Sequence, residues 1–337
     1  MGLKLVIKRS LIPGMVEYYP SQLLYCYSLM YLPVVLKNTP RFFLLFIISI
    51  IIFAGLHIPQ EVKAQEWRPV RGGILYGISG MALVEQKNNS LDFLIVHDNK
   101  KKDEERLAII QLQGKQSLKY SPVKWQNNAE LPIDLEALTP VPGKKSFIAV
   151  TSAGNAYEIK LIASNNILVL QKFDLPKIPQ GSNFEAFSLQ NIDNKLVAVW
   201  AHRGEGKQPA IIYWGILDLD KAKITQVNSA NLTVPFPSGN VRHISDLKVD
   251  ETGVIFISAA SDDGNDGPFK SAVYVAGYVG FRNNKLALQQ NSQLVPLYRS
   301  NAHKIEALEL VPGAGGGVIL GTDDENLGSY VYVMGEA

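Results

Sequence analysis

Short apolar runs bounded by turn-forming residues recur along the chain after residue 65, where the periodicity of amphipathic helices is scarce. Such runs, rich in Val, Ile and aromatic residues, are typical of buried β-strands. The clearest are Leu91–Val96, Ser146–Val150, Lys195–Trp200, Val254–Ile257 and Gly317–Leu320. The pattern predicts an all-β domain.

A motif of four residues precedes each of these runs. Its five copies are Ile78–Met81, Leu135–Leu138, Phe184–Phe187, Ile244–Leu247 and Ile305–Leu308, which start 57, 49, 60 and 61 residues apart. A third apolar run follows in every repeat, and a more polar fourth run follows in the first four. This spacing is near that of propeller blades. We therefore expect a five-bladed β-propeller, with six blades as the alternative, because loops of varying length make blades hard to count.

The N-terminal run Val70–Tyr76 belongs to no repeat, and the last repeat ends after its third strand, Ser329–Met334. Pairing these two runs would complete the last blade and cover two sheet edges. We therefore expect the N-terminal run to close the ring.

The segment Phe42–Leu56 is apolar and uncharged, with basic residues before it and a small residue, Ala64, after it. This order is that of a secretory signal peptide. Its core is shorter than the ~20 residues of a spanning helix, which favours cleavage after Ala64 over anchoring. We expect a leader over 1–64 and a propeller domain over 65–337, exported to the periplasm or the cell exterior. An uncleaved leader would be its only attachment to a membrane.

Composition narrows the classes of function. The one cysteine, Cys26, precedes the expected cleavage site, so the exported domain has neither a disulfide nor a thiol nucleophile. The chain has 33 basic and 31 acidic residues, and six and two of these lie in residues 1–64. The remaining 27 basic and 29 acidic residues exclude a general attraction to nucleic acid. A chain of this length buries a sizeable core as one domain, which we expect to be monomeric.

Two classes of loop share one face of a propeller: those that enter the first strands and those that join second to third strands. Polar residues of this chain gather in both classes. The first class supplies the predicted ligand-binding carboxylates Glu136, Glu185, Asp246 and Glu306. The second supplies the predicted metal ligands Asp98, Asp262, Asp323, Asp324 and Glu325. We expect both sets to meet at one mouth of the central channel.

Carboxylates crowded into one mouth repel each other unless a cation, a proton or a basic partner neutralises them. Calcium is the expected cofactor, because it is bound by several carboxylate, carbonyl and water oxygens. The string Asp262–Asp266 lacks the spacing of the helix-loop-helix calcium motif and is better explained by a solvated turn. The segment Thr322–Glu325 is the better candidate.

His97, His202, His243 and His303 also fall in these two loop classes, and Lys304 follows the last of them. A histidine there can act as a metal ligand, a general base or a phosphate-binding cation. We take His97, His243, His303 and Lys304 as candidate catalytic residues. The alternative is that the histidines bind backbone carbonyls. The sequence shows neither the ligand spacing of a zinc site nor the turn of a serine nucleophile.

Several motifs together resemble a known group of proteins. They are Gly77–Met81 with Val96–Asn99, Asp134–Leu138, Asn183–Phe187, Ile244–Leu247 with Asp266–Phe269, and Lys304–Leu308 with Gly321–Glu325. In these motifs the chain resembles the phytase-like β-propellers of bacteria, which include the esterase-like family named after phytase. The resemblance covers Tyr76–Met334 and implies an exported propeller whose acidic mouth holds calcium and presents it to a phosphoester.

The acidic positions that match this group are Glu136, Glu185, Asp246, Glu306, Asp323, Asp324 and Glu325. The basic residues depart from it, because only Arg203, Arg242 and Lys304 are candidates to hold a substrate phosphate. The sequence therefore favours a binding protein, for a small phosphorylated ligand or an envelope protein, over an enzyme that hydrolyses phytate. The alternative is a calcium-dependent phosphoester or ester hydrolase.

Overall fold

The computed structural model describes residues 66–334, apart from 88–89, 115–117, 127, 163–164, 177–180, 182, 265 and 314–316. The expected leader lies outside the described residues, so its cleavage stays a prediction. Within the described part of the chain, no helix has the length and apolar character needed to cross a membrane.

The described residues form five antiparallel sheets; four are built from consecutive strands, and the fifth joins the last three strands to the first. The first two sheets are β2 (Gly80–Lys87), β3 (Ser90–Val96), β4 (Leu107–Gln113) and β5 (Lys119–Val123), then β6 (Leu135–Pro140), β7 (Phe147–Thr151), β8 (Asn155–Ile162) and β9 (Asn166–Asp174). The next two are β10 (Phe184–Ile192), β11 (Lys195–His202), β12 (Ala210–Asp218) and β13 (Lys223–Leu232), then β14 (Val241–Val249), β15 (Val254–Ser261), β16 (Ser271–Arg282) and β17 (Lys285–Gln290). The fifth contains β19 (Ile305–Val311), β20 (Gly317–Thr322) and β21 (Ser329–Met334).

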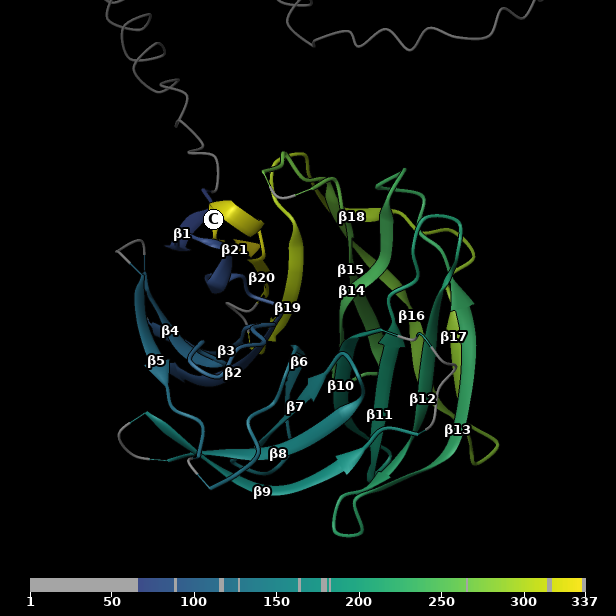
Figure 1. The fold of residues 1–337 in the computed structure, drawn as a ribbon. Coiled ribbons are helices and arrows are strands. Elements are labelled where there is room, and N and C mark those ends of the chain that lie inside the picture. The colour runs from purple at the N-terminus through teal and green to yellow at the C-terminus, as the bar shows by residue number, and fades with distance from the viewer. Residues whose placement is uncertain are drawn as a thin grey trace, which may run out of the picture. The chain divides into compact units, whose positions relative to one another are not determined.

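The sheets are the blades of a propeller. Figure 1 shows them arranged around a common centre, with β2, β6, β10, β14 and β19 innermost. The outermost strands include β5, β9, β13 and β17. The five-bladed all-β fold that the repeats predict is confirmed, and the six-bladed alternative is wrong.

The hydrophobic core lies between neighbouring blades rather than at one centre. On β11, Val199 packs in a cluster shared with the fourth blade, whereas the adjacent Trp200 packs in one shared with the second. Because both faces of a middle strand are buried, its sequence is a continuous apolar run rather than an alternating one.

The N-terminal strand closes the ring, as the sequence predicts. Strand β1 (Arg68–Arg71) pairs antiparallel with β21, and the order of the fifth sheet is β1-β21-β20-β19. The strand is shorter than expected, because Ile74–Tyr76 forms a 3₁₀ turn, η1. The indole Nε1 of Trp67, just before β1, donates a hydrogen bond of 3.1 Å to the hydroxyl of Tyr298.

The fourth blade has a fifth strand that the sequence analysis did not predict. Strand β18 (Pro296–Ser300) pairs with Ser271–Tyr274, the first part of β16, whereas β17 pairs with the second part. A long β16 of 12 residues makes room for both partners. At Gly277 a Cβ atom would lie 2.2 Å from the carbonyl oxygen of Gln289, so the close approach of β17 requires glycine there.

Candidate functional site

Three of the predicted glutamates occupy the same structural position in their blades. Each is the extra residue of a β-bulge at the start of its inner strand: Glu136 in β6, Glu185 in β10 and Glu306 in β19. A bulge turns a side chain out of the regular alternation of the strand. Burial raises the pKa of the Glu136 carboxyl well above its usual value, and the charges of Glu185 and Glu306 add to this effect. The three carboxylates therefore face one space at the channel mouth.

Asp246 does not share that position. In β14 the irregularity spans Arg242–Asp246, and Asp246 lies opposite Ser258, deeper in the strand than the bulged glutamates. Its Oδ2 accepts a hydrogen bond of 2.7 Å from the backbone N–H of Leu308 and lies 3.3 Å from Nζ of Lys248. The sequence motif aligned Asp246 with the glutamates because it could not show the longer bulge. In the fourth blade, Arg242 comes to the mouth instead.

One side of the mouth carries a close group of three carboxylates. Asp98, Asp134 and Glu136 each offer an oxygen atom, and these atoms lie within 4.8 Å of one another. Burial raises the pKa of Asp98 to about 6, and the charges of Glu306 and Asp134 act in the same direction. These carboxylates lie too close together to ionise freely without a cation.

Asp134 is a site residue that the sequence analysis missed. It precedes the bulge with φ of 66°, a left-handed conformation that Asp tolerates better than most residues. Its Oδ2 accepts a hydrogen bond of 2.5 Å from Oγ of Ser152, and Nζ of Lys100 lies 3.1 Å from Oδ1. The one available signal was its place two residues before Glu136 in the repeat motif.

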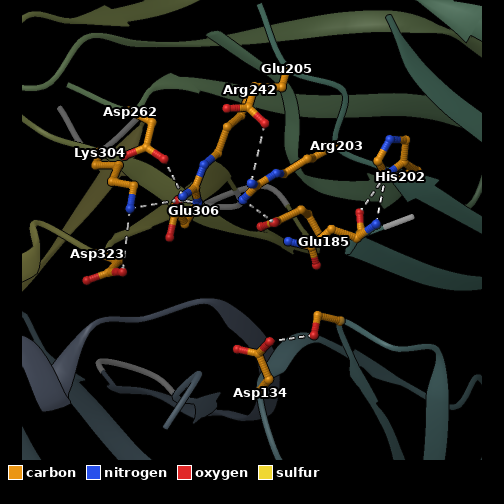
Figure 2. A network of polar contacts seen from close by, with 12 residues as sticks. Asp134, Glu185, His202, Arg203, Glu205, Arg242, Asp262, Lys304, Glu306 and Asp323 are labelled. Carbon is orange, nitrogen blue, oxygen red and sulfur yellow. Dashed lines mark hydrogen bonds and ion pairs between the residues drawn. The ribbon is translucent and has the colours of Figure 1, made fainter. Parts of the chain in front are cut away.

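The other side of the mouth carries the three basic residues that the sequence singled out. Figure 2 shows Arg203, Arg242 and Lys304 in one network with Glu185, Glu306, Asp262 and Asp323. Arg242 bridges two carboxylates, with Nη1 2.7 Å from Glu306 Oε1 and Nη2 2.7 Å from Asp262 Oδ2. Asp262 is therefore held by an arginine, and its predicted role as a metal ligand has no support in the geometry.

At Glu185 and Lys304 the neighbouring opposite charges counteract the effect of burial on the pKa. Burial raises the pKa of Glu185 to about 7, although Arg242 and Arg203 oppose the rise. Burial disfavours the charge on Lys304, but the neighbouring carboxylates, Glu306 foremost, raise its pKa above the usual value. The basic side of the mouth thus holds its charges in pairs.

Asp323 belongs to the mouth and makes a close contact with the first repeat. Burial raises its pKa well above the usual value, Glu306 raises it further, and Lys304 opposes the rise. Nζ of Lys304 lies 3.8 Å from its Oδ2. A Cβ atom at Gly77 would lie 2.1 Å from Asp323 Oδ1. Glycine at position 77 therefore makes room for this carboxylate.

Asp324 and Glu325, the other predicted metal ligands of this segment, have protein partners. Asp324 is fully buried; its Oδ1 accepts the backbone N–H of Lys304 at 2.6 Å, and its Oδ2 lies 2.5 Å from Nδ1 of His303. Glu325 Oε1 lies 2.5 Å from Nζ of Lys304. Asp324 thus orders the loop before β19, and His303 is part of that arrangement.

The two other candidate catalytic histidines also have structural partners. His97 is fully buried, with Nδ1 2.6 Å from the carbonyl of Gly77 and Nε2 3.1 Å from the hydroxyl of Tyr120. His243 accepts the N–H of Val234 at Nδ1 and lies 3.0 Å from the carbonyl of Gly206 at Nε2. Burial lowers the pKa of both imidazoles. Both histidines contact backbone carbonyls, which is the alternative to a catalytic role that the sequence analysis left open.

No family model matches the chain, and no curated protein matches it. Among solved structures the chain is similar to a thermostable family-43 glycoside hydrolase, with a TM-score of 0.44 and 9% identity over 79% of this chain and 91% of the other. It is also similar to a family-43 β-1,3-galactosidase solved with galactodeoxynojirimycin, with a TM-score of 0.44 and 8% identity over 80% of this chain and 92% of the other. The comparisons give no support to a phytase-like family in particular.

Proposed function

We propose that the protein binds a small phosphorylated ligand at this mouth through a divalent cation, with calcium as the favoured ion. The observation that supports the proposal most is the group of Asp98, Asp134 and Glu136, with oxygens within 4.8 Å of one another. Its donors are all oxygen atoms, the type that calcium and magnesium prefer. A bound cation would relieve the repulsion among the three carboxylates. Export of the protein is part of the same proposal.

The basic side of the mouth supports an anionic ligand. An arginine has several N–H donors, and the ion pairs of Arg203 and Arg242 leave some of them unused. The Nε atom of Arg242 is buried and donates to no group among the residues that the structure describes. Phosphate oxygens are strong acceptors for such donors. A ligand held between the cation and the arginines would contact both sides of the mouth.

A calcium titration tests the proposal. We expect calcium to raise the melting temperature of the protein, because an ion that binds only the folded state stabilises it. The variant Asp134→Asn keeps the left-handed backbone and the shape of the side chain, and it should weaken calcium binding at least about tenfold. Asp220→Asn, at an exposed turn, removes one charge elsewhere and should leave the affinity unchanged. An unchanged melting temperature in excess calcium would contradict the proposal.

Hydrolysis of a phosphoester is a second candidate function. It is favoured by the position of Arg203, Arg242 and Lys304 beside the carboxylate group, since phosphoryl transfer needs positive charge around the phosphate. A bound calcium ion would polarise the phosphoryl oxygen. The assay is release of p-nitrophenol from p-nitrophenyl phosphate with calcium present. If the protein releases p-nitrophenol and Asp134→Asn abolishes this activity, the result supports a hydrolase. If the protein binds the ligand but shows no turnover, the result supports a binding protein.

A further inference from the structure

A second hollow lies at the opposite end of the channel from the acidic mouth. It has a volume of about 590 Å³ and is bordered by the C-terminal parts of the inner strands β6, β10, β14 and β19. Its walls include the apolar side chains of Leu83, Leu189, Phe256 and Val318. Two charged residues of the channel, Lys248 and Glu309, also line it. None of the residues of the acidic mouth does so.

Glu309 is the polar group that this hollow leaves unsatisfied. Its side chain is 5% exposed. Oε1 accepts the backbone N–H of Leu310 at 2.9 Å, whereas Oε2 accepts no hydrogen bond from the residues that the structure describes. A buried carboxylate oxygen without a donor is costly, and most buried polar atoms have a partner.

Lys248 neutralises Glu309 only in part: burial raises the pKa of the Glu309 carboxyl, and the charge of Lys248 opposes this rise without cancelling it. Its Nζ donates to the carbonyl oxygen of Leu138 at 2.8 Å and lies 3.3 Å from Oδ2 of Asp246. The same Oδ2 accepts the N–H of Leu308. These contacts join the second, fourth and fifth blades across the channel, between the two mouths. The lysine is therefore shared between Asp246 and Glu309, and the charge of Glu309 is compensated only in part.

The remaining charges at the rim are also acidic. Asp250 and Glu251, in the turn after β14, line the hollow. An anionic ligand would meet repulsion here. A metal ion is a poor fit too, because calcium needs several oxygen ligands and the walls are largely apolar.

We propose that this hollow binds a small organic cation, in which an ammonium group donates to Glu309 Oε2 and an alkyl or aryl body packs against the apolar walls. The ammonium supplies the missing donor and a second positive charge besides that of Lys248. The apolar body covers surface on Leu83, Leu189 and Phe256. Pockets for small molecules commonly combine apolar walls with a few placed polar groups in this way.

Isothermal titration calorimetry of the full chain tests the proposal, with hexylamine and 1-hexanol as probes. At pH 8 the amine is charged, and the Glu309 carboxyl, whose pKa burial raises to about 7, is mostly ionised. A charge-assisted hydrogen bond should make hexylamine bind at least about tenfold more tightly than hexanol. Glu309→Gln should remove most of that difference. Asp103→Asn, in an exposed loop outside the hollow, should not change it.

A second variant tests the hollow without changing Glu309, in case Glu309→Gln fails to fold. Leu310→Trp adds bulk to a half-buried position in the wall and leaves the carboxylate in place, and it should weaken both the amine and the alcohol. Equal affinity for amine and alcohol, full affinity in Glu309→Gln, or no binding of hexylamine to the unmodified protein would each overturn the proposal.

Discussion

The carboxylates near the channel mouth differ in what surrounds each one. Asp98 and Glu136 lie among other acids, which raise the pKa of each beyond the effect of burial. Asp324 is fully buried, and a backbone N–H and His303 contact its two oxygens. From their residue type and loop position, the sequence analysis assigned all three to the site. The neighbours decide that the first two carboxyls face other acids and that the third orders a loop.

Gly77→Ala tests the contact that holds Asp323. The new Cβ would overlap with Oδ1 of this carboxylate, at 2.1 Å, so either the first repeat or Asp323 must shift. We expect a loss of about 1–3 kcal/mol in the free energy of unfolding. Gly72→Ala is a matched control, because nothing lies within 4 Å of its Cβ. Urea denaturation measures both, and equal losses would contradict the contact.

At the scale of elements, the bulges at the starts of β6, β10 and β19 create the acidic mouth. The repeated motif predicted these three positions because all three blades share one register there. It misplaced Asp246, because β14 carries a longer irregularity between Arg242 and Asp246. A motif of four residues fixes which blade a residue belongs to, but pairing with the next strand fixes its depth in the channel.

Trp67→Ala tests how the N-terminal strand is held. The indole donates to Tyr298 and lies against Tyr332 and His303, with ring centroids 5.1 and 4.5 Å away. Since this half-buried ring packs against the fifth blade, its removal should cost about 2 kcal/mol. Tyr298→Phe removes only the hydrogen bond and should cost about 1 kcal/mol or less. Thermal unfolding of both variants provides the measurement; a larger loss in Tyr298→Phe would contradict the packing argument.

At the scale of the whole molecule, the channel contains several buried carboxyl groups that make stability depend on pH. Burial raises the pKa of Asp246 to about 6 and the pKa of Glu309 to about 7. These carboxyls bind protons more tightly in the folded protein than in the unfolded chain. Between about pH 4 and 7 the folded state therefore holds more protons, and its stability falls as the pH rises through this window.

Glu309→Gln should reduce this dependence on pH. The glutamine is neutral at every pH, so the variant avoids the cost of ionising a buried group. Relative to the unmodified protein, it should gain on the order of 2 kcal/mol of stability between pH 5 and pH 8. Denaturant titrations at the two pH values measure this difference. The same pH slope in both proteins would show that Glu309 does not titrate in this range.

The sequence by itself determined the five-fold repeat, the strand order within each blade and the closure by the N-terminal run. These features depend on the local alternation of apolar runs and turns, which recurs in all five repeats; β18 of the fourth blade lies outside this pattern. Only the tertiary structure decided that Asp134 joins Asp98 and Glu136, that Arg242 pairs with Glu306, and that Oε2 of Glu309 has no donor among the described residues. Each of these contacts joins different blades or loops, and its geometry follows from bulges and packing rather than from neighbouring residues in the chain.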